Sequence, residues 1–376
     1  MWPDSRITNL LGINIPVIQA PMAGAQGAAL AIAVAKAGAL GSVPCATLKP
    51  DQVRSEVDHF RRRIAAPINL NFFCHPEPEY DAAREAAWRA QFAACYDEFG
   101  IELDLSSSAG LFPIDQDMCD AVVELRPEVV SFHFGLPHRS IVNRIKAIGA
   151  KILSSATTIA EARFLEANGC DAVIAQGAEA GGHRGMFLAT DIARQVGTLA
   201  LVPQVVDTIR IPVIAAGGIA DARGVVAALA LGASGVQIGS AYLRCDESDI
   251  KPVHRKLLRS SDADQTVLTN VFTGRPARSI VNRAIREAGP MNNAVQEFPL
   301  AAAALSPLKA KTEGTSDFIP LWCGQSSALG RDVAAGVFTT DLAAATKALL
   351  KSLSTGARGR SGARSSGRQR PTSQSR

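Results

Sequence analysis

The sequence predicts an α/β protein built on a (β/α)8 TIM barrel, with helical insertions that form a cap over the active site. Short apolar runs bounded by glycine or proline alternate with alanine-rich helical stretches along most of the chain. The runs are continuous rather than alternating, which is typical of parallel strands buried on both faces. Several helical stretches end in a glycine step, which suits a compact turn into a strand. A doubly wound open sheet is the competing architecture.

Eight apolar runs follow one another from residue 17 to residue 239 and are the expected barrel strands. The active site of such a barrel lies at the carboxyl ends of its strands, so residues that follow each run are the candidates for chemistry. The runs are Val17–Ala20, Leu40–Val43, Ile68–Phe73, Val129–Phe134, Lys151–Ser155, Ala172–Gln176, Pro212–Ala216 and Gly235–Gly239.

Two connections are too long for single helices, namely residues 74–128 and residues 246–318. Barrels accept insertions at their loops, where the added segments often build a wall above the active site. We expect both segments near the active site, as one small domain or as two separate additions. The barrel with its insertions should occupy residues 1–350.

Residues 351–376 are rich in serine, glycine and arginine and contain no acid, so the net charge of +4 originates in this tail. Such a composition cannot bury enough apolar surface to offset its ordering entropy, and we expect a disordered basic tail. A weak contact with nucleic acid or a membrane surface is the less favoured alternative. The basic residues are Lys351, Arg358, Arg360, Arg364, Arg368, Arg370 and Arg376.

The composition is that of a soluble enzyme in a reducing compartment. Hydrophobic residues make up 47% and charged residues 20% of the chain. The 7 cysteines are scattered without a CxxC pair, which argues against a disulfide framework and a zinc site. The sequence contains neither a signal-peptide pattern nor an apolar run of about 18 residues. We expect a cytoplasmic protein without metal or membrane partner, and the sequence leaves its oligomeric state open.

Glycine-rich turns follow the seventh and eighth expected strands. Gly217 and Gly218 end the seventh, and Gln237-Ile238-Gly239-Ser240 ends the eighth. In many barrels the loops at these positions bind a phosphate group, because glycine lets backbone N–H groups approach an anion closely. The alternative is that these glycines only make tight turns.

Two histidines follow or end strands. His183 lies in the glycine-rich segment 176–185 directly after the sixth strand, where an imidazole could reach over a flat ligand and transfer a proton. His133 lies within the fourth strand, where a polar group must be partnered or belong to a site. The amides of Gln19, Asn71 and Gln176 lie at or near strand ends and suit the polar edges of a flavin ring.

The chain resembles the nitronate monooxygenase family, formerly called 2-nitropropane dioxygenases, over about residues 7–345. The resemblance rests on Gln19-Ala20-Pro21-Met22, Asn71, residues 131–135, residues 180–185, residues 216–219, residues 237–240 and residues 321–325. It implies noncovalent FMN held by the residues above together with Gly181, and oxidation of alkyl nitronates by dioxygen to carbonyl compounds and nitrite. It also implies that His183 is the base for neutral nitroalkanes and that His133 orients or stabilises the nitro group, although the two roles could be exchanged.

The chain departs from the family where related enzymes place tyrosines in the substrate pocket. It has only 3 tyrosines, and residues 109–113 and Phe318 offer apolar groups instead, which favours a more apolar substrate than propionate 3-nitronate. Arg184 or the arginines of residues 275–286 could still supply a positive charge.

Alternatives to the nitronate monooxygenase function are an FMN-dependent NAD(P)H enoyl-ACP reductase or quinone reductase, a barrel that only stores flavin, and an IMP-dehydrogenase-like enzyme, which would require a reactive loop cysteine. The remaining histidines, His59, His75, His138 and His254, suggest exposed or helix-capping positions, with His75 a marginal pocket candidate.

Overall fold

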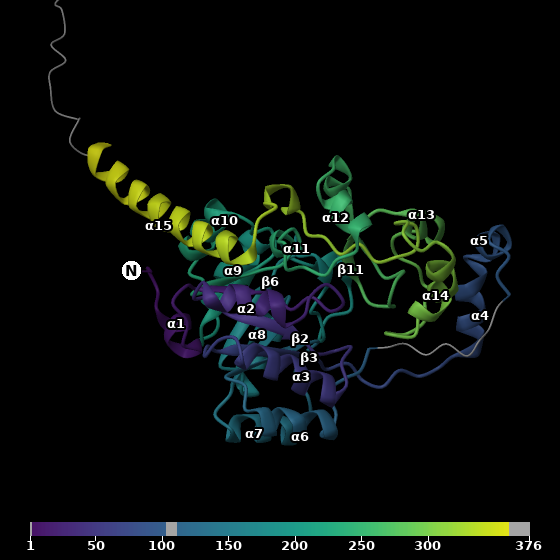
Figure 1. Cartoon of the computed structure of the whole chain (residues 1–376), viewed down its shortest axis with the longest axis horizontal. Coiled ribbons are helices and arrows are strands. Elements are labelled where there is room, and N and C mark those ends of the chain that lie inside the picture. Colours follow the sequence, from purple (N-terminus) through teal and green to yellow (C-terminus); the bar gives the residue numbers. More distant parts are fainter. Residues whose placement is uncertain (1, 103–110, 361–376) are drawn as a thin grey trace, which may run out of the picture.

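Eight parallel strands form a closed barrel in the computed structural model, which describes residues 2–102 and 111–360 (Figure 1). The first and second strands close the sheet, because the Gln19 N–H donates to the Leu40 carbonyl over 2.9 Å. The predicted barrel and all eight expected strands are confirmed. The strands are β1 (Val17–Gln19), β2 (Gly41–Pro44), β3 (Ile68–Phe73), β4 (Val129–His133), β5 (Lys151–Ala156), β6 (Ala172–Gln176), β8 (Val213–Ala216) and β9 (Gly235–Ile238).

Helices surround the barrel, and apolar side chains fill it. Nearly every strand residue is buried because one face packs on the lumen and the other on the helices, which explains the continuous apolar runs. The N-terminal helix α1 (Arg6–Leu11) contributes Ile7 and Leu11 to a core cluster with strand residues such as Ile18. The covering helices are α2 (Ala28–Lys36), α3 (Pro50–Arg61), α6 (Gln116–Leu125), α7 (Arg139–Ala147), α8 (Ile159–Ala167), α9 (Thr198–Val206), α10 (Ala222–Ala230) and α15 (Ala335–Arg360).

The two insertions share one hydrophobic core. Helices from the first lie beside helices from the second, at the side of the barrel away from α15 (Figure 1). The Trp88 indole N–H donates to the Ala301 carbonyl over 3.0 Å, and the Tyr96 hydroxyl donates to the Ala304 carbonyl over 2.7 Å. The two segments therefore form one unit. Its helices are α4 (Ala82–Ala90) and α5 (Ala93–Glu98) from the first insertion and α13 (Arg283–Ala288) and α14 (Ala302–Lys311) from the second. Helix α12 (Pro252–Leu258), also in the second insertion, packs in a separate cluster through Leu258.

A small antiparallel sheet joins the second insertion to the loop after β6. The strand β11 (Ala277–Ile280) pairs with β10 (Thr266–Thr269) on one side and with the short strand β7 (Gly182–His183) on the other, so that His183 lies opposite Ala277. The loop that the sequence suggested around His183 is thus partly a strand. The remaining elements are α11 (Ser240–Leu243), η1 (Ile192–Arg194), η2 (Ser261–Asp264) and η3 (Ser327–Leu329).

The tail that the sequence predicts to be disordered from Lys351 onward begins within a helix. Helix α15 continues to Arg360 and extends away from the barrel (Figure 1), and residues 361–376 lie outside the described residues. The earlier part of α15 is anchored by buried residues such as Phe338 and Leu342. Adding residues to an existing helix costs far less than starting one, so the exposed residues 351–355 continue it without burial of their own.

Candidate active site

A cavity of about 480 Å³ lies at the carboxyl ends of the barrel strands. Side chains and backbone from most of the strand ends line it, as expected for a barrel with its chemistry at this end. Most of the predicted site residues are brought together here: Ala20, Pro21, Met22, Asn71, His133, Gln176, Gly181, His183, Gly217, Gly218, Gln237, Gly239 and Ser240.

Gln19 and Ile238 do not line this cavity, unlike the other residues predicted to contact the cofactor. Gln19 is fully buried, and its side-chain oxygen accepts the Ser42 N–H over 2.9 Å. Ile238 is buried in the main hydrophobic core. Successive strand residues point to opposite faces, so Gln237 faces the cavity while Ile238 faces the helices.

His133, at the end of β4, has both ring nitrogens engaged by protein groups. Its Nε2 lies 3.1 Å from the carbonyl oxygen of His183, and its Nδ1 lies 3.1 Å from the Ser155 hydroxyl. A carbonyl oxygen only accepts, so Nε2 carries the hydrogen and Nδ1 accepts from Ser155. This arrangement fixes the neutral tautomer and leaves His133 without a lone pair for a substrate proton.

His183 has one ring nitrogen bonded to a protein side chain within the described residues. Its Nε2 lies 2.9 Å from the Thr273 hydroxyl. The main chain of His183 is held by the β7–β11 pairing and by Gln176, whose side-chain amide donates to the His183 carbonyl over 3.0 Å. The ring lies 5.2 Å from the indole of Trp322, centroid to centroid. His183 is thus a positioned imidazole whose Nδ1 has no protein partner in this part of the chain.

Both imidazoles are neutral at physiological pH. Burial lowers the pKa of His183 to about 3, and the charges of neighbouring cationic groups add to this effect. Burial likewise lowers the pKa of His133 to about 4, although its bond to the His183 carbonyl opposes the shift. A neutral imidazole can accept a proton, which is the first requirement for a general base.

Arg184 supports the site from behind instead of supplying charge to a substrate. It is fully buried, and its guanidinium donates to the carbonyls of Gln176 and Gly177 over 2.7 and 2.6 Å. These bonds fix the end of β6, and the Gly185 N–H donates to the Gln176 side-chain oxygen over 2.8 Å. The suggestion that Arg184 supplies a positive charge to a substrate is therefore corrected.

Backbone N–H groups converge at the glycine-rich end of the cavity. Within the hydrogen-bond network of residues 2–102 and 111–360, the N–H groups of Gly218, Gly239 and Ser240 donate to no protein acceptor. The Ser240 hydroxyl accepts the Gly324 N–H over 2.8 Å and keeps its own hydrogen to donate. Among the described residues, the buried side-chain oxygen of Gln237 also has no hydrogen-bond partner. Such donors fit a phosphate group, and such an oxygen fits an N–H donor of a bound ring.

Several cavity residues were not predicted. Thr273 and the two rim lysines Lys251 and Lys309 come from the second insertion, and Phe73 ends β3. Trp322 lies in the segment 321–325, which the family resemblance pointed to without assigning it a contact.

His75 and His254 are buried rather than exposed, contrary to expectation, and burial lowers the pKa of each to about 4. Phe318 is buried in the shared core of the insertions, and so does not line the cavity.

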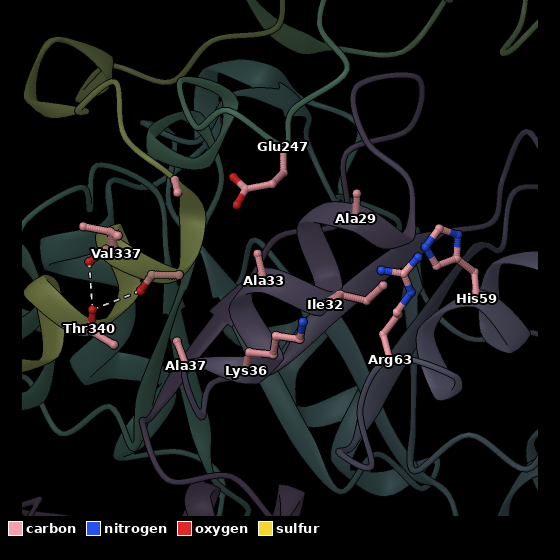
Figure 2. Close-up of a pocket in the computed structure, with 12 residues that line it drawn as sticks. Ala29, Ile32, Ala33, Lys36, Ala37, His59, Arg63, Glu247, Val337 and Thr340 are labelled. Atoms are coloured by element: carbon pink, nitrogen blue, oxygen red, sulfur yellow. Dashed lines mark hydrogen bonds between the residues drawn. The ribbon is translucent and has the colours of Figure 1, made fainter.

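A second hollow, of about 630 Å³, lies between α2, α3 and the start of α15 (Figure 2). Small apolar residues such as Ala33 and Ala37 line it together with Lys36 and Arg63. The Glu247 carboxylate at its edge accepts the Ala335 N–H over 2.8 Å. The predicted site residues all lie elsewhere, so the barrel cavity is the candidate active site.

In residues 2–102 and 111–360, no group of three or more His, Cys, Asp or Glu side chains is arranged to hold a metal ion. Within the same ranges, no helix combines the length and apolar character needed to cross a bilayer.

Comparisons with known proteins agree with this geometry. The model of the nitronate monooxygenase family matches residues 4–344. A nitronate monooxygenase from Pseudomonas aeruginosa is 42% identical over 335 residues, 88% of this chain and 95% of that protein. The nitroalkane oxidase structure from Streptomyces ansochromogenes has a TM-score of 0.83 and 36% identity, covering 93% of this chain and 100% of that one. FabK from Thermotoga maritima has a TM-score of 0.71 and 29% identity, covering 94% and 99%. The chain belongs to the nitronate monooxygenase family of flavin-dependent oxidoreductases.

Proposed function

We propose that the enzyme uses FMN and dioxygen to oxidise alkyl nitronates to carbonyl compounds and nitrite. We also propose that it accepts neutral nitroalkanes, with His183 as the base. The observation that carries the second part is the difference between the two histidines. Both ring nitrogens of His133 are engaged by protein groups, whereas His183 lines the cavity with Nδ1 available.

The proposed flavin site consists of the convergent donors and the amides. The N–H groups of Gly218, Gly239 and Ser240 would hold the terminal phosphate, which favours FMN, since its phosphate is a chain end. Asn71 and Gln237 would contact the polar edges of the ring. When bound, FMN supplies the capacity to take electrons from a nitronate and pass them to dioxygen.

In the proposed proton transfer, the Nδ1 lone pair of His183 takes a proton from the carbon that bears the nitro group. The C–H electron pair stays on the substrate, which becomes the nitronate. The Nε2–H would donate to the Thr273 hydroxyl at 2.9 Å and thus fix the tautomer that exposes Nδ1. His133 would act through its bond to the His183 carbonyl, as a positioning residue.

The proposed substrate is an alkyl nitronate with a short apolar chain. Phe73, Leu111, Ile319 and Trp322 line the cavity with apolar surface. The proposal includes a cytoplasmic location, supported by the 7 cysteines, all of which are free.

The base assignment is tested with paired substrates. We expect His183→Asn to lower kcat/KM for nitroethane about 100-fold or more, the range of a lost general base. The loss on ethyl nitronate, which needs no deprotonation, should be far smaller. The initial rates are measured from nitrite release. Equal losses on both substrates would contradict the role of His183 as base, and His133→Asn serves as the comparison because it leaves the Nδ1 of His183 in place.

The cofactor and the competing reductase activity are tested on the purified protein. Denaturation should release FMN into the supernatant, identified by chromatography. Under anaerobic conditions, ethyl nitronate should bleach the flavin absorbance, whereas NADH should not. Rapid bleaching by NADH would favour the enoyl reductase or quinone reductase alternative, which the similarity to FabK keeps in view.

A further inference from the structure

Arg275 lies next to the active-site cavity without lining it, and its guanidinium stacks on aromatic rings. Its guanidinium carbon is 4.2 Å from the centroid of the Phe134 ring and 5.8 Å from that of Phe298. One of its N–H groups donates to the Met186 carbonyl over 3.1 Å. Among the residues that the structure describes, no carboxylate forms an ion pair with it. Arg275 is therefore a half-buried cation held by a π-system and a carbonyl.

The same two phenylalanine rings contact three imidazoles. The Phe134 ring lies 4.6 Å from the His133 ring and 5.9 Å from the His183 ring, centroid to centroid. The Phe298 ring lies 4.8 Å from His75 and 5.4 Å from His183. A fixed guanidinium charge thus shares one aromatic cluster with three groups that could each become cationic.

We propose that Arg275 is a positioning residue for the base: its fixed charge, held on the Phe134 ring, adds to burial in disfavouring protonation of the His183 imidazole in the resting enzyme. This inference rests on the proposed role of His183 as base. Arginine suits this function because it stays protonated at every pH at which the enzyme operates. Like charges in a region shielded from water repel strongly, so the guanidinium disfavours an imidazolium nearby.

The groups that act on His183 come from every element packed against it. Burial is the largest influence on its pKa, followed by the charges of His133, Arg275 and His75. The Thr273 hydroxyl, which bonds to the Nε2 of His183, is uncharged. Of these groups only Arg275 is charged throughout the physiological range, because burial also lowers the pKa values of His133 and His75 to about 4. When a proton moves from the substrate carbon to His183, the new nitronate charge offsets the repulsion.

The competing explanation is that Arg275 only packs the site together. Two variants separate charge from packing. Arg275→Gln removes the charge but retains an N–H donor for the Met186 carbonyl, and Arg275→Lys keeps a charge while losing the planar fork. A purely structural role predicts similar effects of both variants, or effects that follow thermal stability.

The test is a histidine NMR titration of the FMN-loaded enzyme with labelled imidazoles. The chain has 6 histidines, and His183→Asn assigns the signal of interest. In Arg275→Gln, the His183 midpoint should rise by about one pH unit, corresponding to a tenfold change in protonation, whereas Arg275→Lys should stay close to the wild type. The acid limb of kcat/KM should move up equally with nitroethane and remain in place with ethyl nitronate.

An unshifted His183 midpoint in a folded Arg275→Gln enzyme would overturn the inference. If that variant does not fold, Arg275→Met provides the second neutral substitution, and a midpoint equal to that of the wild type has the same meaning. Failure of the proposed function is distinguishable, because it would appear as retained nitroethane oxidation in His183→Asn, whatever the midpoint.

Discussion

Gly181 shows how closely the backbone segments approach one another beside the cavity. A β-carbon at this position would lie 2.5 Å from the Gly324 nitrogen and 2.7 Å from the Cys323 carbonyl carbon. Both atoms belong to the backbone, so neither can rotate aside as a side chain would. The glycine is thus required by lack of space, and it keeps the segment that carries Trp322 against the loop that carries His183.

We expect Gly181→Ala to push these two segments apart. Overpacking of this kind costs about 1–3 kcal/mol, and the apoprotein should bind FMN at least about tenfold more weakly, measured by fluorescence titration. Gly149→Ala is the matched control, because Gly149 has a φ of +85° but open space around it. It should lose about 1 kcal/mol from backbone strain and bind FMN normally. Equal FMN affinity in both variants would refute this explanation.

At the scale of elements, Glu161 ties helix α8 to the loop that follows His183. It is fully buried, and its carboxylate accepts N–H groups from Thr157, Phe187 and Leu188 over 2.7, 2.7 and 3.1 Å. It also accepts the hydroxyl of Thr157 over 2.8 Å. An ionised carboxylate can satisfy this many donors because it has two acceptor oxygens and no hydrogens.

Glu161→Gln should destabilise the protein by about 3 kcal/mol, since the amide places its own donors against buried N–H groups. Urea denaturation at neutral pH measures the change in the free energy of unfolding. Glu124→Gln is the control, because Glu124 forms an exposed ion pair with Arg54 and should change stability by less than about 1 kcal/mol. A loss no larger than that of the control would show that the loop does not depend on Glu161.

The elements also show what could be predicted from the sequence. The eight strands were predictable because burial on both faces leaves a continuous apolar run, as in β3 and β6. The glycines and histidines at strand ends were predictable because every parallel strand ends at the same mouth. The direction of individual side chains was not predictable, because a one-residue error in the position of a strand reverses which of Gln237 and Ile238 faces the cavity. Thr273 was also beyond prediction, because it contacts His183 from 90 positions away.

For the whole molecule, the buried histidines predict how stability depends on pH. The pKa values of His75, His133 and His254 are about 4, and that of His183 is about 3, all below the ordinary value of 6.5. The unfolded chain therefore binds protons at a higher pH than the folded chain does. The free energy of unfolding should have its full value above about pH 6.5. It should fall as the pH drops toward 4, by about 1.4 kcal/mol per pH unit for each such histidine.

The corresponding experiment compares urea denaturation at pH 7 and pH 5 for the wild type and for His75→Phe. His75 is buried, and neither of its ring nitrogens has a hydrogen-bond partner among the described residues. Replacing it with phenylalanine should raise stability at pH 7 by about 1 kcal/mol and flatten the pH dependence by the share of one histidine. An unchanged slope in the variant would mean that His75 does not titrate differently on folding.

The hydrogen bond from Trp88 to Ala301 joins residues 213 positions apart. During translation, the large apolar side chains of α4 and α5 leave the ribosome long before their partners in α14 are made. At common elongation rates this interval is on the order of ten seconds or more. The nascent chain therefore exposes the apolar surface of α4 and α5 while most of the barrel is synthesised. We expect a chaperone to bind the nascent chain at these two helices.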